Sequence, residues 1–242
     1  MIANAENAAG GRGLTIALAR ELFEAGADVL TMGDHVWDQK DLVKQIESEP
    51  RILRPANLPP ASPGKGWVTL ETPKGRVTVI NLVGRVFMPP MDCPFRAVDE
   101  ILGRKEEMGR VIVADVHAEA TSEKIALGRY LDGRVSVVVG SHTHVQTADE
   151  SVLPGGTAYI TDLGMTGPKD SILGRDYESV LSRFVTGLPV QFKVAKNDVK
   201  LEGVLVPVDA ETGKAAGIQR ISIKLQKQHD AGNEEQQPAV DG

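Results

Sequence analysis

Residues 111–117 read VIVADVH, and residues 135–144 read VSVVVGSHTH. Each stretch begins as a continuous apolar run of the length expected for a buried strand in an α/β sheet. The first run leads directly to His117, and the second leads to His142 and His144. In open α/β sheets, ligands bind outside the carboxyl ends of the strands. The two stretches therefore predict an α/β sheet whose carboxyl edge carries three imidazoles.

Strands and helices alternate through most of the remaining sequence. Further strands are expected at residues 2–4, 27–33 and 157–162, with a hairpin at residues 67–82. Periodic apolar residues predict helices at 14–25, 38–48, 95–108, 121–131 and 176–187. Asp38 is the expected N-cap of the second helix, and a Ser/Thr–Glu signal opens the helix at residue 121. Antiparallel strands are expected at 191–195, 199–208 and 218–225. This order favours a layered α/β or α/β/α sandwich with an antiparallel portion.

The composition narrows the class of protein. Hydrophobic residues make up 41% of the 242 residues, which is typical of a folded domain. We assign residues 1–225 to a single folded domain. Residues 226–242 are polar and rich in Gln, Glu, Asn and Gly, which predicts a disordered tail. The net charge of -6 argues against a nucleic-acid partner or a membrane surface. The sequence has neither a membrane-spanning run nor a signal peptide, and its single cysteine, Cys93, fits the reducing cytoplasm.

Polar residues also follow two other predicted strands. Glu6 and Asn7 come after the strand at 2–4, and Asp34 and His35 come after the strand at 27–33. Four strand ends are thus expected to bring one set of side chains to the same edge: Glu6, Asn7, Asp34, His35, His117, His142 and His144.

This set suits metal-dependent chemistry at phosphorus. Imidazole, carboxylate and amide groups together bind Zn, Mn or Fe, and one carboxylate can bridge two cations. Two metal ions about 3.5–4 Å apart activate a water molecule and stabilise in-line displacement at a phosphodiester. A histidine that is not a ligand can protonate the leaving oxygen. The pattern therefore favours a dinuclear phosphoesterase site.

Each residue alone also has an ordinary structural interpretation. A single histidine after a strand is commonly a hydrogen-bonded loop residue, and a structural zinc site is usually closed and rich in cysteine. Glu119 is interpreted as a helix-capping residue, and Arg85 as a loop anchor or a phosphate ligand. Because all seven residues share the strand-end position, the metal site is the preferred interpretation.

Seven segments of the chain resemble the YmdB-like family of bacterial metallophosphoesterases. In order along residues 1 to about 220 they are AENAAGG, GDHVWD, LRPANLPP, GRVFMPPMDCPF, HAEATSEK, GSHTHVQTADE and TDLGMTGP. The resemblance implies a calcineurin-like layered α/β/α sandwich with mixed sheets. It also implies two divalent metal ions, Fe or Mn in preference to Zn, and phosphodiesterase activity on substrates such as cyclic nucleotides.

The resemblance also assigns roles to individual residues. The implied metal ligands are Glu6 as the bridge, Asn7 and His144 on the first ion, and Asp34, His117 and His142 on the second. His35 matches the proton donor that acts opposite a metal-activated hydroxide. Asp34 stands where the family has asparagine, and this difference adds negative charge beside an anionic substrate.

A second departure lies at the N-terminus. Family members begin with a strand, a Gly-Asp motif whose aspartate binds the first metal, and a helix, and none of these precedes Ile2. The domain at 1–225 is thus expected to be truncated relative to the family, with exposed strand edges that favour a homo-oligomer. The alternative to an active phosphodiesterase is a catalytically impaired or inactive remnant that binds metal or nucleotide without turnover.

Overall fold

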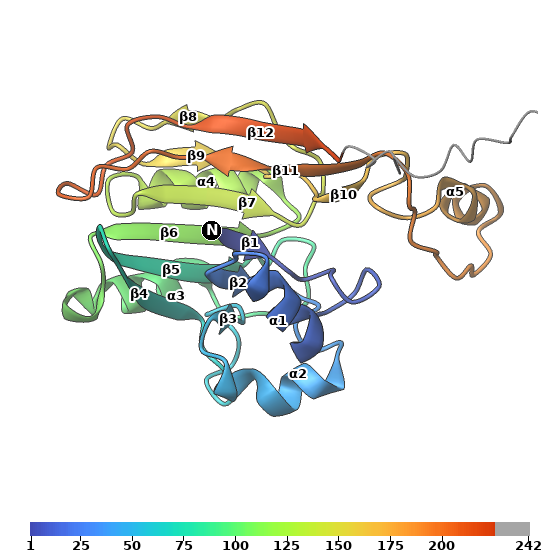
Figure 1. The fold of residues 1–242 in the computed structure, drawn as a ribbon, viewed down its shortest axis with the longest axis horizontal. Coiled ribbons are helices and arrows are strands. Elements are labelled where there is room, and N and C mark those ends of the chain that lie inside the picture. Colours follow the sequence, from blue (N-terminus) through green and yellow to red (C-terminus); the bar gives the residue numbers. More distant parts are fainter. Residues whose placement is uncertain (226–242) are drawn as a thin grey trace, which may run out of the picture.

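The computed structural model describes residues 1–225, and Figure 1 shows their arrangement. A six-stranded sheet forms the centre, in the order β4 (Trp67–Thr72), β5 (Gly75–Val83), β6 (Val111–His117), β7 (Val137–Ser141), β9 (Ala158–Ile160) and β8 (Ser151–Val152). Strands β5, β6, β7 and β9 are parallel, while β4 and β8 are antiparallel to their neighbours. The carboxyl ends of the parallel strands therefore lie along one edge.

Two smaller sheets complete the strand layers. A parallel sheet contains β1 (Ile2–Asn4), β2 (Val29–Thr31) and β3 (Ile52–Leu53). An antiparallel sheet contains β10 (Gly167–Pro168), β11 (Val199–Leu205) and β12 (Gln219–Lys224). The expected layered α/β architecture with mixed sheets is confirmed.

Apolar side chains hold the layers together. One face of the six-stranded sheet packs on α3 (Pro94–Leu102) and α4 (Thr121–Leu131), through a cluster that includes Leu82, Val98 and Leu127. On the other face, Val79 of β5 packs with Val29 of β2. Helices α1 (Ile16–Glu24) and α2 (Lys40–Gln45) cover the outer side of the parallel sheet. Two sheets thus lie between helical layers, and α5 (Tyr177–Thr186) extends to one side (Figure 1).

Several sequence-based boundaries were wrong. The helix expected at 38–48 is α2 followed by a 3-10 turn, η1 (Ile46–Ser48), and its N-cap position is Gln39. Asp38 caps nothing there, because its carboxylate accepts a hydrogen bond from Arg12 Nε at 2.8 Å. The helix expected at 95–108 ends at Leu102, with Gly103 at its C-cap, and a 3-10 turn, η2 (Lys105–Glu107), follows.

Several strands also differ from the prediction. Residues 191–195 form no strand; Val194 makes only an isolated bridge with Arg175. The short strands β3, β8 and β10, of two residues each, were not predicted, because so few residues carry no periodicity. The tail predicted at 226–242 lies outside the described residues.

Candidate metal centre

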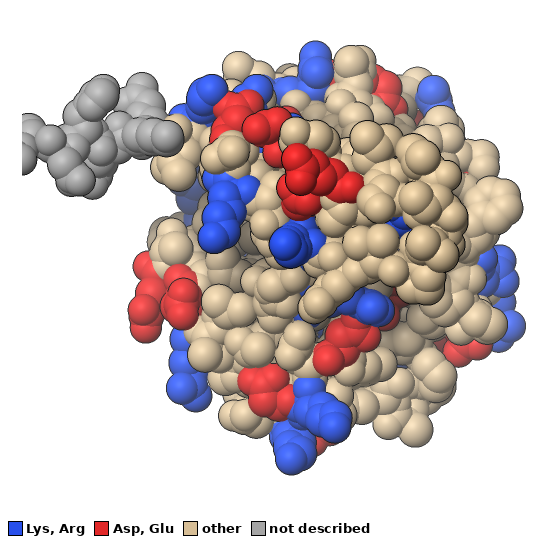
Figure 2. Space-filling view, turned by 90° about the vertical axis from the view of Figure 1, so that its right-hand side faces the viewer, with Lys and Arg blue, Asp and Glu red and all other residues tan. Residues whose placement is uncertain are grey.

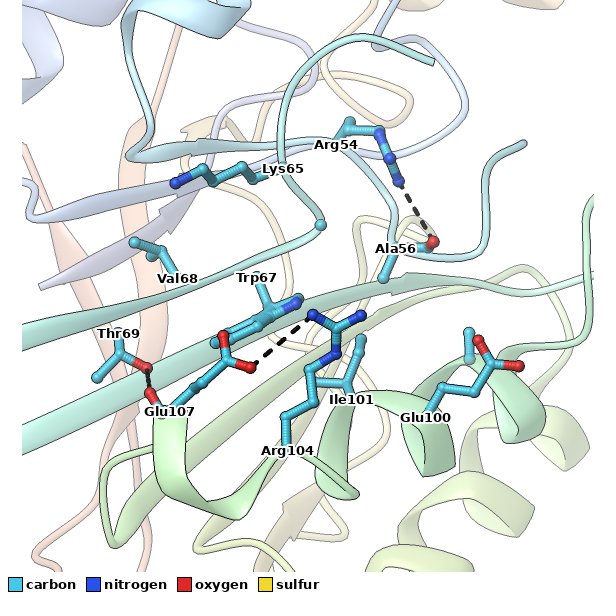
Figure 3. A pocket seen from close by; sticks show the side chains of 12 residues that line it. Arg54, Ala56, Lys65, Trp67, Val68, Thr69, Glu100, Ile101, Arg104 and Glu107 are labelled. Atoms are coloured by element: carbon cyan, nitrogen blue, oxygen red, sulfur yellow. Dashed lines mark hydrogen bonds and ion pairs between the residues drawn. The ribbon is translucent and has the colours of Figure 1, made fainter. Parts of the chain in front are cut away.

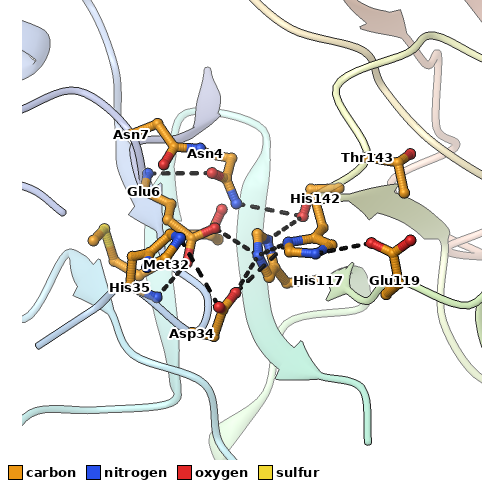
Figure 4. Close-up of polar contacts among 12 residues, drawn as sticks. Asn4, Glu6, Asn7, Met32, Asp34, His35, His117, Glu119, His142 and Thr143 are labelled. Carbon is orange, nitrogen blue, oxygen red and sulfur yellow. Dashed lines mark hydrogen bonds and ion pairs between the residues drawn. The ribbon is translucent and has the colours of Figure 1, made fainter. Parts of the chain in front are cut away.

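Four side chains from four separate strand ends converge at the carboxyl edge. Glu6 follows β1, Asp34 follows β2, His117 ends β6, and His142 follows β7. One ligand atom from each lies within 4.8 Å of the others, and Figure 4 shows the side chains facing one another. These four residues are called the metal-ligand group below.

The contacts within the metal-ligand group centre on His117. Its Nε2 lies 2.5 Å from Glu6 Oε2, 3.2 Å from Asp34 Oδ1 and 3.0 Å from His142 Nδ1. Glu6 and His117 are each only 1% exposed. A Cβ atom at Gly33 would overlap the His117 ring. The glycine before Asp34 therefore lets the His117 ring lie close to the backbone.

Electrostatics show that this arrangement needs a positive charge. Burial lowers the pKa of the His117 imidazole, but the charge of Glu6 and the hydrogen bonds with Asp34 and Glu6 outweigh it and raise the pKa to about 10. Burial raises the pKa of Asp34, but the hydrogen bond and charge of His117 lower it to about 2. The buried Glu6 carboxyl group and the partly buried Asp34 carboxyl group are therefore stabilised by a nearby cation, and the His117 proton supplies one.

A divalent metal ion fits the same place. Among residues 1–225, no lysine or arginine forms an ion pair with Glu6 or Asp34. Burial and the charge of His117 lower the pKa of His142, which leaves its imidazole neutral and able to bind a metal. Two carboxylates and two imidazoles form a donor set suited to Fe, Mn or Zn.

Asn7 and His144 form a second pair beside the metal-ligand group. Asn7 Nδ2 lies 3.0 Å from His144 Nε2, and His144 Nδ1 lies 3.3 Å from the carbonyl oxygen of Leu173. Asn7 directly follows Glu6, and His144 lies two residues after His142. The pair is therefore close in sequence to two members of the metal-ligand group, Glu6 and His142.

The loop that carries two of the histidines is strained. His142 has a φ of 100° and His144 a φ of 63°, in the left-handed region that side chains other than glycine rarely adopt. Between them, the backbone amide and the hydroxyl of Thr143 donate to Asp162 Oδ2 at 3.1 and 2.7 Å. Such conformations persist only where the surroundings enforce them. Asp162 provides that enforcement.

Asp162 is itself held by a buried ion pair. Lys124 of α4 donates to Asp162 Oδ2 at 2.7 Å, and the two residues are 1% and 0% exposed. The amide of Gly164 donates to Oδ1 at 2.9 Å. A buried carboxylate with this many donors has a fixed position, so it fixes the histidine loop.

A second buried carboxylate lies behind His117. Ser141 Oγ lies 3.0 Å from His117 Nδ1 and donates to Asp115 Oδ1 at 2.7 Å, while Thr31 donates to Asp115 Oδ2 at 2.5 Å. Asp115 is two residues before His117 on β6 and therefore lies on the same face. This series of hydrogen bonds orients the His117 ring so that Nε2 faces the metal-ligand group.

Sequence reasoning missed Asp115, Asp162 and Lys124, and it misinterpreted Glu119. The N-cap position of α4 is Ala120, and no side chain caps it. Instead, Glu119 Oε2 lies 3.1 Å from His142 Nε2, the ring nitrogen that faces away from the group. A carboxylate on the outer nitrogen of a metal-binding histidine fixes its tautomer. Its position two residues after His117 was the available signal.

His35 lies beside the metal-ligand group without belonging to it. Its Nδ1 lies 3.0 Å from Asp38 Oδ2, and its Nε2 lies 4.0 Å from Asp34 Oδ2. Its backbone amide donates to Glu6 Oε1 at 2.6 Å. The ring is therefore held on one nitrogen, and the other is directed toward the edge of the site (Figure 4).

The surface features do not compete with this site. A hollow between β4 and α3, lined by Arg54, Trp67 and Arg104 among others, contains none of the metal-ligand group (Figure 3). The end view in Figure 2 shows positive and negative side chains interspersed with uncharged surface. Within residues 1–225, no helix has both the length and the apolar character needed to cross a bilayer.

A family model described as YmdB-like protein matches residues 1–221. The chain belongs to the YmdB-like family. A 2′,3′-cyclic-nucleotide 2′-phosphodiesterase of Bacillus subtilis (strain 168) is 52% identical over 222 residues, covering 92% of this chain and 84% of the relative.

Two solved structures share the YmdB-like architecture. A hypothetical protein from Thermus thermophilus superposes with a TM-score of 0.87 and 45% identity, covering 92% of this chain and 86% of that chain. A novel phosphatase from Mycoplasma pneumoniae superposes with a TM-score of 0.86 and 36% identity, and the match covers 92% of this chain and 81% of that chain. The fold is calcineurin-like, as the resemblance implied.

Proposed function

We propose that this chain is a metal-dependent phosphodiesterase that hydrolyses small phosphodiesters such as 2′,3′-cyclic nucleotides. The broader class is plain from the relatives: the chain is a hydrolytic phosphoesterase. The observation that carries the finer proposal is the metal-ligand group, with four donor atoms within 4.8 Å at the carboxyl edge of the sheet.

We assign two divalent ions to the site, Fe or Mn in preference to Zn. Glu6 would contribute to holding both ions; its Oε2 contacts His117, and its Oε1 accepts from the His35 amide. Asn7 and His144 would hold the first ion, and Asp34, His117 and His142 the second. When bound, such ions lower the pKa of a water molecule and neutralise charge on the phosphodiester.

The protein side chains supply orientation and a proton. Attack of water at phosphorus breaks the bond between phosphorus and one ribose oxygen, and that oxygen needs a proton as it leaves. His35 Nε2 would donate it, and the contact of Nδ1 with Asp38 Oδ2 at 3.0 Å supports this role because it leaves Nε2 free. The single product is a nucleoside monophosphate with one free ribose hydroxyl, which carries the proton from His35, while the proton of the attacking water passes to the solvent and the imidazole is reprotonated. The buried Asp162 and Asp115 keep the ligands in place throughout.

Residues 1–225 are proposed to act as one phosphoesterase domain, since the cores join all three sheets around a shared edge. The single cysteine, Cys93, supports assignment to the cytoplasm.

Hydrolysis of 2′,3′-cyclic AMP tests the function directly. We expect monophosphate release in the presence of Mn²⁺, loss of release on chelation, and recovery when Mn²⁺ is returned. The product is measured by chromatography, and circular dichroism confirms folding in each condition. Mn²⁺ binding by a folded chain without hydrolysis would contradict the proposal and favour the inactive metal-binding alternative.

Asp34 gives a prediction specific to this chain. Its low pKa makes it an anion at neutral pH. Asp34→Asn is expected to lower the KM for 2′,3′-cyclic AMP by about fivefold, the factor equivalent to about 1 kcal/mol for unit charges 4 Å apart in water. We also expect weaker Mn²⁺ binding, measured by calorimetry, because one anionic ligand is lost. Unchanged KM together with unchanged metal dependence would show that the charge of Asp34 has no role.

A further inference from the structure

We propose that the loop at residues 84–92 binds the nucleobase of the substrate and that Phe87 is the residue on which the base stacks. The inference rests on the proposed function, because it requires that the metal centre bind the phosphodiester of a nucleotide. It adds a specificity-determining residue that is neither a metal ligand nor a proton donor.

Phe87 combines two unfavourable properties. Its side chain is 89% exposed, although burial of an aromatic ring is favourable. Its φ is 60°, in the left-handed region that is costly for a residue with a bulky side chain. Backbone strain of this kind clusters at ligand-binding positions, where the surrounding structure enforces it. Neither the exposure nor the backbone strain of Phe87 stabilises the fold. We therefore infer that Phe87 has this conformation because it binds a ligand.

The loop around Phe87 is held firmly at its start. The amide of Gly84 donates to the carbonyl oxygen of His117 at 2.9 Å. The carboxylate of Glu123, only 7% exposed, accepts from the Arg85 amide at 2.9 Å and from the Val86 amide at 3.1 Å. Glu123 was part of the Ser/Thr–Glu capping signal expected at the start of α4. Its carboxylate instead binds the backbone of the loop at residues 84–92.

The far end of the loop is fixed as well. Asn57 Nδ2 donates to the carbonyl oxygens of Val83 at 2.7 Å and Asp92 at 2.8 Å. A Cβ atom at Gly84 would collide with Ala118, so the loop leaves β5 in close contact with the segment that follows His117. Phe87 is therefore presented from a clamped loop.

The attachment points place the loop next to the metal centre. It rests on the segment 117–123, which supplies the ligand His117 and the carboxylate of Glu119 that contacts His142. Phe87 is three residues from Gly84, so the backbone between them spans at most about 10 Å. A base joined through ribose to a phosphate at the metal centre lies within reach of this loop.

The chemistry of the loop suits a nucleotide. Stacking on an aromatic ring tolerates any base, because every base has a flat π-face. Arg85 is exposed, and its guanidinium makes no hydrogen bond or ion pair with the part of the chain that the structure describes. An unpaired cation two residues along the chain from an exposed ring favours an anionic aromatic ligand over a neutral one.

Two substrates separate base recognition from chemistry. Glycerol 1,2-cyclic phosphate has the five-membered cyclic phosphodiester of 2′,3′-cyclic AMP but no base. For Phe87→Ala we expect kcat/KM on 2′,3′-cyclic AMP to fall by a factor between about 5 and about 150, the equivalent of the 1–3 kcal/mol of a stacked base. Activity on the glycerol compound should not change. Phe87→Tyr, which keeps the ring, should retain activity on both.

Phe184→Ala is the matched control, because Phe184 is also a highly exposed phenylalanine, on α5. It should alter neither activity. Equal losses on both substrates in Phe87→Ala, or no loss on either, would overturn the stacking role. If the unaltered chain hydrolyses neither compound, the proposed function fails. Calorimetry of adenosine 3′-monophosphate with the Mn²⁺-loaded protein then tests stacking alone, and equal affinity in Phe87→Ala would refute it.

Discussion

Replacing His35 with alanine is expected to lower kcat on 2′,3′-cyclic AMP by about 10²- to 10⁴-fold, the usual contribution of a general acid. The reason is the leaving group: a ribose alkoxide is strongly basic and cannot depart efficiently without a proton. His35 Nε2 is the ring nitrogen on the site side, because Nδ1 is held by Asp38 at 3.0 Å.

We expect the substitution to leave the metal-ligand group in place. The contact between residue 35 and Glu6 is made by the backbone amide, which alanine retains. Mn²⁺ binding, measured by calorimetry, should therefore change little. This separates loss of the proton from loss of the metal.

A substrate with a good leaving group provides the decisive comparison. p-Nitrophenolate leaves without a proton, so bis(p-nitrophenyl) phosphate should be hydrolysed by His35→Ala at nearly the rate of the unaltered chain. A loss of equal size on both substrates would mean that His35 acts on the attacking side or on folding. A loss of Mn²⁺ binding would make it a ligand.

Lys124→Met is expected to destabilise the folded chain by about 3–5 kcal/mol, since removal of one partner leaves a buried charge without compensation. Asp162 is 0% exposed, so water cannot replace the ammonium group. The free energy of unfolding should be measured by urea denaturation with a chelator present, so that metal binding does not contribute.

Two further variants show whether the charge is the cause. Lys124→Met combined with Asp162→Asn should regain part of the loss, because the amide oxygen still accepts from Thr143 while the unpaired charge is gone. Lys44→Met, at an exposed lysine of α2, should change stability by no more than about 0.5 kcal/mol. A loss in Lys124→Met no larger than that of Lys44→Met would show that the pair is not important for stability.

The sequence was informative where the fold follows from strand order. Parallel strands place their carboxyl ends at one edge, so residues that follow them meet whatever the details of packing. This brought Glu6, Asp34, His117 and His142 together as expected. Their assignment to particular ions, and the role of His35, stay predictions.

The supporting residues could not be found in the same way. Asp115 and Lys124 lie within segments that pack in the core, and nothing local shows that their charges face partners far along the chain. The Asp38 cap failed for the same reason: a short acidic side chain beside a helix has several partners available, and tertiary contacts with Arg12 decide among them. Helix ends such as that of α3 depend on turns too short for a periodic signal.

The left-handed backbone at His142 and His144 bears on which ions the centre accepts. A loop clamped by Asp162 has little freedom to lengthen or shorten the reach of its imidazoles. Affinity for divalent ions otherwise follows a general order set by the metals themselves, and proteins depart from it through geometry. In this chain, discrimination between ions by radius would therefore depend on the carboxylate of Asp162 and the ammonium group of Lys124, neither of which is assigned as a ligand.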